Sequence, residues 1–155
     1  MKLGLCQMPV TASKTENNAT MRRYVRDATA AGCDLVVLPE MWCCPYSNAA
    51  FAEYAEPQGG RTWRLLRDTA RESGVWLAAG IVPERDGDAI YNTCYVFDPN
   101  GTQRAKHRKV HLFDIDVAGG QRFFHTFSFG NFLLSYQLFY LRSRRQEGTD
   151  VDKDR

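Results

Sequence analysis

Residues 35–38 read Leu-Val-Val-Leu, and this short apolar run constrains the fold more than any other segment of the chain. It lacks the alternation of polar and apolar side chains, which is typical of a strand buried on both faces. Pro39 follows at once and cannot donate to a sheet ladder, so the strand ends there. A strand of this kind indicates an α/β fold, in which helices cover a largely parallel sheet.

A helix is predicted immediately before this strand. Ser13 and Glu16 match a capping box, and apolar residues follow at helical spacing until Gly32, a typical C-terminal glycine. Because a first apolar strand is predicted over residues 3–8, the segment up to residue 38 forms a strand-helix-strand unit. Such units give parallel strand pairs with a right-handed crossover.

Downstream of this unit, the pattern predicts a loop, a second helix and three further strands. The predicted elements are a loop over 39 to about 60, a helix over about 62–73, strands over 75–82 and 89–97, a hairpin turn at 86–87, a tight turn at 98–101 and a last strand from 102. The expected order is therefore β-α-β-α-β-β-β, in two layers.

The composition excludes several classes of function. The net charge of +2 over 155 residues gives no footprint for nucleic acid or for an anionic membrane. The five cysteines are odd in number and irregularly spaced, which argues against a disulfide framework and a zinc site and for a reducing compartment. The N-terminus has too short an apolar run for a signal peptide, so we expect a cytoplasmic protein without a metal or cofactor.

Glu40 is the first candidate functional residue. It lies just past the carboxyl end of the buried strand, and ligands bind at that edge in open α/β sheets. Position alone equally allows a glutamate on a solvated loop, or one paired with an arginine.

Three phrases make the interpretation more specific: "LPEMW", "YNTCYVFDPNG" and "KHRKVHLFDID". Together they resemble the nitrilase, or carbon–nitrogen hydrolase, superfamily, and within it the ω-amidase branch. The resemblance covers residues 1 to about 122. It implies half of an αββα sandwich, the four-layer form being made by dimerisation, and hence a homo-oligomer.

The resemblance also implies hydrolysis of a small ω-amide to an acid and ammonia by a Cys-Glu-Lys triad. A thiolate attacks the amide carbon, a glutamate moves protons and a lysine stabilises the oxyanion and the intermediate. Glu40 corresponds to the glutamate and Lys109 to the lysine, although Lys109 alone also fits a solvated basic strand. Phe113 either lines the pocket or belongs to the core, and His107 and His111 are expected to be structural.

The nucleophile of the family has no counterpart. No cysteine follows Cys94, and the stretch 119–130 lacks the family's second glutamate. Cys43 or Cys44 could replace the thiol only by reproducing its line of attack, so we interpret both as loop cysteines near a pocket rim. Residues 1–122 are thus a partial hydrolase domain, expected to be inactive alone. The alternative is a non-catalytic half-domain that binds an intact homologue.

Residues 123–155 form a divergent tail. No charge occurs over 123–141 when His125 is neutral, and the segment that follows is mostly charged and predicted to be disordered. Three interpretations remain open: an aberrant or alternative C-terminus, a segment that covers the exposed sheet, and a membrane tail. Polar residues weaken the last of these.

Overall fold

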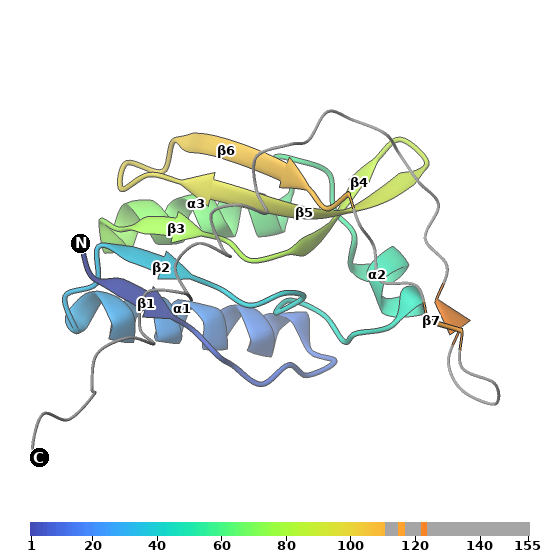
Figure 1. The fold of residues 1–155 in the computed structure, drawn as a ribbon, viewed down its shortest axis with the longest axis horizontal. Coiled ribbons are helices and arrows are strands. Elements are labelled where there is room, and N and C mark those ends of the chain that lie inside the picture. Colours follow the sequence, from blue (N-terminus) through green and yellow to red (C-terminus); the bar gives the residue numbers. More distant parts are fainter. Residues whose placement is uncertain (111–114, 117–121, 124–155) are drawn as a thin grey trace, which may run out of the picture. The chain divides into compact units, whose positions relative to one another are not determined.

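The computed structural model describes residues 1–110, 115–116 and 122–123, which fall into two units, Met1–Lys109 and Val110–Arg155 (Figure 1). In the second unit, β7 (Ile115–Asp116) pairs antiparallel with β8 (Arg122–Phe123). The elements of the first unit are, in chain order, β1 (Leu3–Leu5), α1 (Lys14–Ala30), β2 (Leu35–Val37), α2 (Asn48–Tyr54), α3 (Arg61–Ser73), β3 (Trp76–Ala78), β4 (Val82–Asp86), β5 (Ala89–Phe97) and β6 (Gln103–Arg108).

The first unit is built on one mixed sheet. Strands β1, β2 and β3 are parallel neighbours, and β3 pairs antiparallel with β5. The long strand β5 also pairs antiparallel with both β4 and β6, and it is the single partner of β6 among the described residues. This arrangement confirms the predicted α/β class.

Helix α1 begins where the capping pattern predicts. The Ser13 hydroxyl accepts a hydrogen bond from the Glu16 backbone N–H at 3.2 Å. The Glu16 carboxylate does not return to Ser13; it accepts from the Thr11 hydroxyl at 2.9 Å, and that hydroxyl accepts from the Ser13 N–H at 3.1 Å. In a capping box the Glu16 carboxylate would bind the Ser13 N–H directly, whereas here the Thr11 hydroxyl links the two groups.

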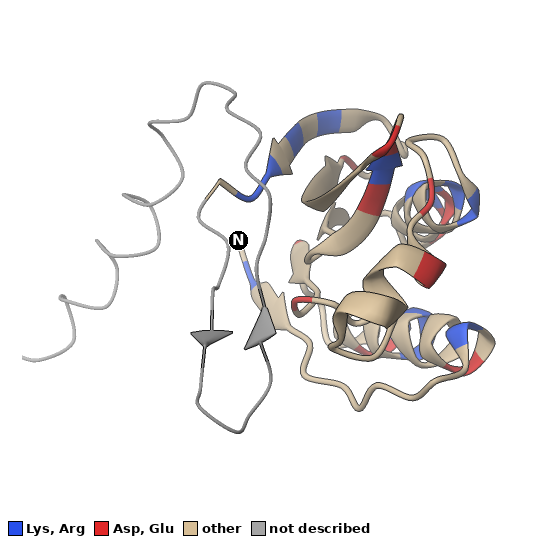
Figure 2. Ribbon diagram, turned by 90° about the vertical axis from the view of Figure 1, so that its right-hand side faces the viewer, with Lys and Arg blue, Asp and Glu red and all other residues tan. Residues whose placement is uncertain are grey.

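Helices α1 and α3 lie on the same side of the sheet (Figures 1 and 2). Val36 of β2 and Leu77 of β3 point into this interface and are 0% exposed, as are Met21 and Val25 of α1. Gly4 of β1 lies in register with Val36 and Leu77, and a Cβ there would stand 3.1 Å from that of Ala28 on α1.

The other face of the sheet carries exposed apolar side chains. Leu5 on β1 is 72% exposed, and Leu3 and Trp76 are also exposed. The prediction that residues 35–38 are buried on both faces was wrong, because Leu35 and Val37 alternate with Val36 and are only half-buried. In the part of the chain that the structure describes, helices cover one face of this strand only.

Two further predictions differ from the structure. The single strand expected over 75–82 is two strands, β3 and β4, because Gly80 adopts a left-handed backbone with φ of 63° that ends β3. The segment expected as a loop over 39–60 contains α2, whose N-cap Ser47 accepts a hydrogen bond from the Ala50 N–H at 3.2 Å. Its seven residues are too few for a clear helical periodicity.

Candidate active site

The segment after β2 carries Glu40 and runs beside the segment after β3. The Leu38 N–H donates to the Ala78 carbonyl at 3.0 Å, and the Met41 N–H donates to the Ile81 carbonyl at 2.8 Å. Glu40 itself forms an isolated parallel bridge with Ile81. The backbone at Glu40 is therefore held by hydrogen bonds beyond the end of the regular strand.

A close approach of two backbones fixes this segment. A Cβ on Gly80 would lie 2.1 Å from the Pro39 carbonyl oxygen, so only glycine fits. The fully buried Trp42 donates its indole N–H to the Ala79 carbonyl at 2.9 Å. Met41, which directly precedes Trp42, adopts a left-handed φ of 52°. Residues other than glycine rarely adopt this backbone conformation. Strained backbone of this kind is often found at functional sites.

Lys109 directly follows β6. Its backbone N–H donates to the Asn92 carbonyl at 2.8 Å, which continues the β5–β6 ladder by one step beyond the pair Thr93–Arg108. Because side chains alternate along a strand, Lys109 points away from the face that carries Arg108.

These two segments bring Glu40 and Lys109 into contact. The Lys109 ammonium donates to the Glu40 carboxylate, with 2.9 Å between Nζ and Oε1, and the side chains are 27% and 38% exposed. A carboxylate can accept a proton and an ammonium can stabilise a developing oxyanion. Both groups therefore remain partly open to solvent.

The other predicted residues of the site are distributed differently. Phe113 and His111 lie outside the described residues. His107 lies on β6 opposite Cys94 of β5, and burial lowers its pKa.

The position predicted for the two loop cysteines was wrong. Cys43 and Cys44 are each only 1% exposed and belong to the hydrophobic core, not to a pocket rim. The hydrogen bond between the two thiols lowers the pKa of Cys44 and raises that of Cys43. The loop turns inwards here because Trp42 is buried beside them and Asn17 of α1 donates to the Cys43 carbonyl at 3.3 Å. Both thiols are therefore closed off from solvent.

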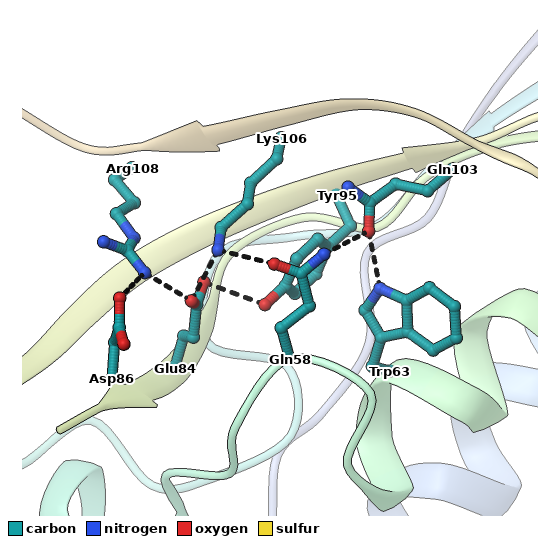
Figure 3. A network of polar contacts seen from close by, with 8 residues as sticks. All are labelled: Gln58, Trp63, Glu84, Asp86, Tyr95, Gln103, Lys106 and Arg108. Atoms are coloured by element: carbon teal, nitrogen blue, oxygen red, sulfur yellow. Dashed lines mark hydrogen bonds and ion pairs between the residues drawn. The ribbon is translucent and has the colours of Figure 1, made fainter.

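Sequence reasoning missed one charged cluster, which is drawn in Figure 3. The Glu84 carboxylate on β4 is 2% exposed and is paired with Lys106 and Arg108 of β6. The two cations occur at alternate positions, as expected for one face of a strand, but the sequence does not show that a buried acid faces them.

The described residues contain no group of three or more His, Cys, Asp or Glu side chains arranged to hold a metal ion. In the same part of the chain, no helix has the length and apolar character that a membrane crossing requires. Residues 123–141, which carry the uncharged part of the tail, are outside it except for Phe123.

Comparisons with known proteins place this fold among the nitrilases. The structure of Nit3 from Saccharomyces cerevisiae, a member of branch 10 of the nitrilase superfamily, superposes with a TM-score of 0.67 and 31% identity, over 72% of this chain and 44% of that one. The omega-amidase NIT2 of Danio rerio is 43% identical over 122 residues, which are 79% of this chain and 44% of the relative. The chloroplastic omega-amidase of Arabidopsis thaliana is also 43% identical over 122 residues, but these are only 33% of its length.

The family model of the carbon-nitrogen hydrolases matches residues 2–146. The chain therefore belongs to the carbon–nitrogen hydrolase family and is ω-amidase-like, as the three phrases predicted. It spans less than half the length of the curated relatives it matches. The family match runs past residue 122, while the alignments to the relatives cover 122 residues, so the division into 1–122 and 123–155 stays a prediction.

Proposed function

We propose that this chain supplies the glutamate and the lysine of an ω-amidase-type active site, which hydrolyses a small ω-amide to an acid and ammonia. Glu40 is the proton acceptor and Lys109 stabilises the oxyanion. The observation that supports this assignment is the 2.9 Å contact between the Lys109 ammonium and the Glu40 carboxylate.

The environment of the pair suits this chemistry. Hydrogen bonds of the neighbouring backbone anchor the Glu40 segment, and the Glu40 carboxylate accepts from Lys109 through Oε1. The ammonium at 2.9 Å places a positive charge beside the carboxylate, which is the arrangement that the proposed reaction needs. Lys109, in turn, can move its flexible ammonium from Glu40 to an oxyanion without a change in the backbone.

The reaction also needs a nucleophilic thiol, and no cysteine of this chain suits that role. Cys6, Cys43 and Cys44 are buried, and Cys33 and Cys94 are half-buried. Burial raises the pKa of Cys94, which disfavours the thiolate. We therefore expect the 155-residue chain alone to be inactive. Turnover would require a nucleophilic thiol supplied by a different polypeptide segment. Assembly into a homo-oligomer, a cytoplasmic location and a role for Phe113 in the substrate pocket are part of the same proposal.

The exposed apolar face of the sheet favours a second candidate function. A half-domain could use this face, with Leu3, Leu5 and Trp76, to bind an intact homologue without catalysing anything itself. Size-exclusion chromatography of this chain mixed with an intact ω-amidase measures such binding directly.

An ammonia-release assay tests the catalytic proposal. The substrate is a 2-oxo acid monoamide, and the proteins are the 155-residue chain and a chimaera in which its first 122 residues are joined to the C-terminal part of an intact ω-amidase. We expect no release by the chain and clear turnover by the chimaera. Glu40→Gln or Lys109→Met in the chimaera should reduce the rate by about a thousandfold or more, because the residues of one catalytic unit act together.

Two exposed residues provide matched controls. Glu53→Gln and Lys2→Met make the same chemical changes at the surface and should leave turnover unchanged. An active Glu40→Gln chimaera would refute the assignment. Turnover by the unmodified chain that disappears in Cys43→Ser or Cys44→Ser would show that a core thiol is the nucleophile.

A further inference from the structure

The buried carboxylate of Glu84 is bound by three donors, two of them from one strand. It accepts from the Lys106 ammonium and the Arg108 guanidinium, each at 2.6 Å on Oε1, and from the Tyr95 hydroxyl at 2.8 Å on Oε2 (Figure 3). Burial opposes its charge, but these hydrogen bonds outweigh that effect and hold the pKa of Glu84 below its ordinary value. A charge buried at this depth is stable only with such partners.

Strand β6, which carries both cations, needs an anchor. In the part of the chain that the structure describes, it pairs with β5 alone. Its register shifts between Val96 and Phe97, since Val96 faces Ala105 whereas Phe97 faces Gln103. Arg104 is the extra residue, and its guanidinium bonds to Asp98 at 2.7 Å. A bulge bends a strand and increases its local twist, so the ladder alone does not fix the direction of β6 beyond it.

The two ends of β6 are held on the helix side of the sheet. Before the bulge, the side-chain amide oxygen of Gln103 accepts from the indole N–H of Trp63 on α3 at 2.6 Å. After the bulge, Lys106 and Arg108 are the residues bound to Glu84, and basic positions recur along β6 in Figure 2. The second anchor is therefore the one next to Lys109.

Additional contacts hold the Arg108 and Lys106 side chains in the orientation that reaches Glu84. The Arg108 guanidinium also donates to Asp86 at 2.7 Å and stacks on the Tyr91 ring, 3.8 Å from its centroid. Lys106 donates in addition to the Gln58 side chain at 2.8 Å. Every one of these contacts lies on the face opposite to that of Lys109.

We propose that Glu84 is a positioning residue for the candidate active site: by holding Lys106 and Arg108 on one face of β6, it presents Lys109 on the other face towards Glu40. The inference rests on the proposed function, in which Lys109 is the oxyanion-stabilising group. Arg108 and Lys109 are consecutive, so a rotation of β6 that released Arg108 from Glu84 would turn the Lys109 side chain away from Glu40.

Trace acetylation of the 155-residue chain, quantified by mass spectrometry as the rate at Lys109 relative to exposed Lys2, tests this without any need for turnover. Glu84→Gln should raise the relative rate at Lys109 about two- to fivefold, the factor expected from loss of a partly exposed ion pair. Glu40→Gln, which removes the partner itself, sets the upper limit. Glu84→Asp keeps the charge and should restore part of the protection.

Leu66→Ala is the control matched for stability, because Leu66 is fully buried on α3 and is not one of the residues bound to Glu84. It should leave the relative rate at Lys109 unchanged; an increase equal to that of Glu84→Gln would overturn the proposal, since general loosening would then explain both. If Glu84→Gln does not fold, Arg108→Gln replaces it, because that side chain is 31% exposed and Glu84 keeps Lys106.

The outcomes separate the two levels of inference. An increase with Glu40→Gln but none with Glu84→Gln or Arg108→Gln would overturn the positioning role and leave the proposed function standing. No increase with Glu40→Gln would mean that the pair does not protect Lys109 in solution, which would overturn both.

Discussion

The Pro39 carbonyl oxygen lies 2.1 Å from the position that a Cβ on Gly80 would occupy. These residues follow β2 and β3, so the close approach is what sets Glu40 next to Ile81. Gly80 also has a left-handed φ of 63°, and both properties require glycine. The shape of the candidate site thus depends on a residue that takes no part in its chemistry.

Gly80→Ala is expected to destabilise the chain strongly. Its cost combines about 1–2 kcal/mol for a left-handed non-glycine residue with about 1–3 kcal/mol for forcing the two backbones apart. The matched control is Gly87→Ala, with a φ of 59° but open space around it, which should cost the backbone term alone. Urea unfolding of both variants measures the difference, and equal losses of free energy would contradict the role of the close approach.

Glu84→Gln is expected to lower the free energy of unfolding by about 3 kcal/mol, because it leaves two cations without their buried partner. Asp68→Asn removes a partly exposed acid that pairs with Arg67 and Arg71 and should cost at most about 1 kcal/mol. Thermal unfolding at neutral pH compares the two, and a similar small loss for both would mean that the buried network contributes little.

The lowered pKa of Glu84 also predicts how the stability of the chain depends on pH. Its hydrogen bonds lower the pKa of Glu84 in the folded protein, so its contribution is complete above the unfolded value of about 4.3. That contribution is lost as the pH falls through the folded value. The free energy of unfolding of Glu84→Gln should therefore decline less steeply in acid than that of the parent chain or of Glu53→Gln. Parallel acid profiles for all three proteins would refute this.

Solubility should respond to the exposed face of the sheet. Leu5 is 72% exposed beside half-buried apolar residues of β2, and such surfaces favour association. Leu5→Lys should reduce concentration-dependent light scattering, whereas Ala19→Lys, which adds the same charge at an exposed position of α1, should have a smaller effect. Equal improvement by both variants would attribute association to net charge instead of to this face.

The order in which the cysteines are alkylated tests whether burial or thiol ionisation controls their reactivity. The pKa of Cys44 is lowered by its hydrogen bond with Cys43, yet its side chain is almost completely buried. Because alkylation needs access as well as a thiolate, we expect iodoacetamide to modify half-buried Cys33 and Cys94 first. Mass spectrometry of the native chain gives the order of modification, and early labelling of Cys44 would show that the loop opens.

Much of the architecture follows from local signals in the sequence. The capping residue Ser13 predicts the start of α1, and the Asp-Gly turn at 86–87 predicts the β4–β5 hairpin. The run at 35–38 predicts a strand with Glu40 just beyond its end. These features involve neighbouring residues, so the sequence displays them directly, and the family phrases add the roles expected for Glu40 and Lys109.

What only the tertiary structure decided are the contacts between distant segments. Nothing local indicates that Lys106 and Arg108 face a buried Glu84, since a basic strand looks the same in sequence whether water or an acid neutralises it. Nor does the sequence show that Cys43 and Cys44 turn into the core, which depends on Trp42 reaching the Ala79 carbonyl. Glu40 and Lys109 are separated by 69 in sequence number, and they meet because of the register of β5 and β6 and the Pro39–Gly80 approach. Such relationships arise from packing in three dimensions, and the linear pattern of side chains does not record them.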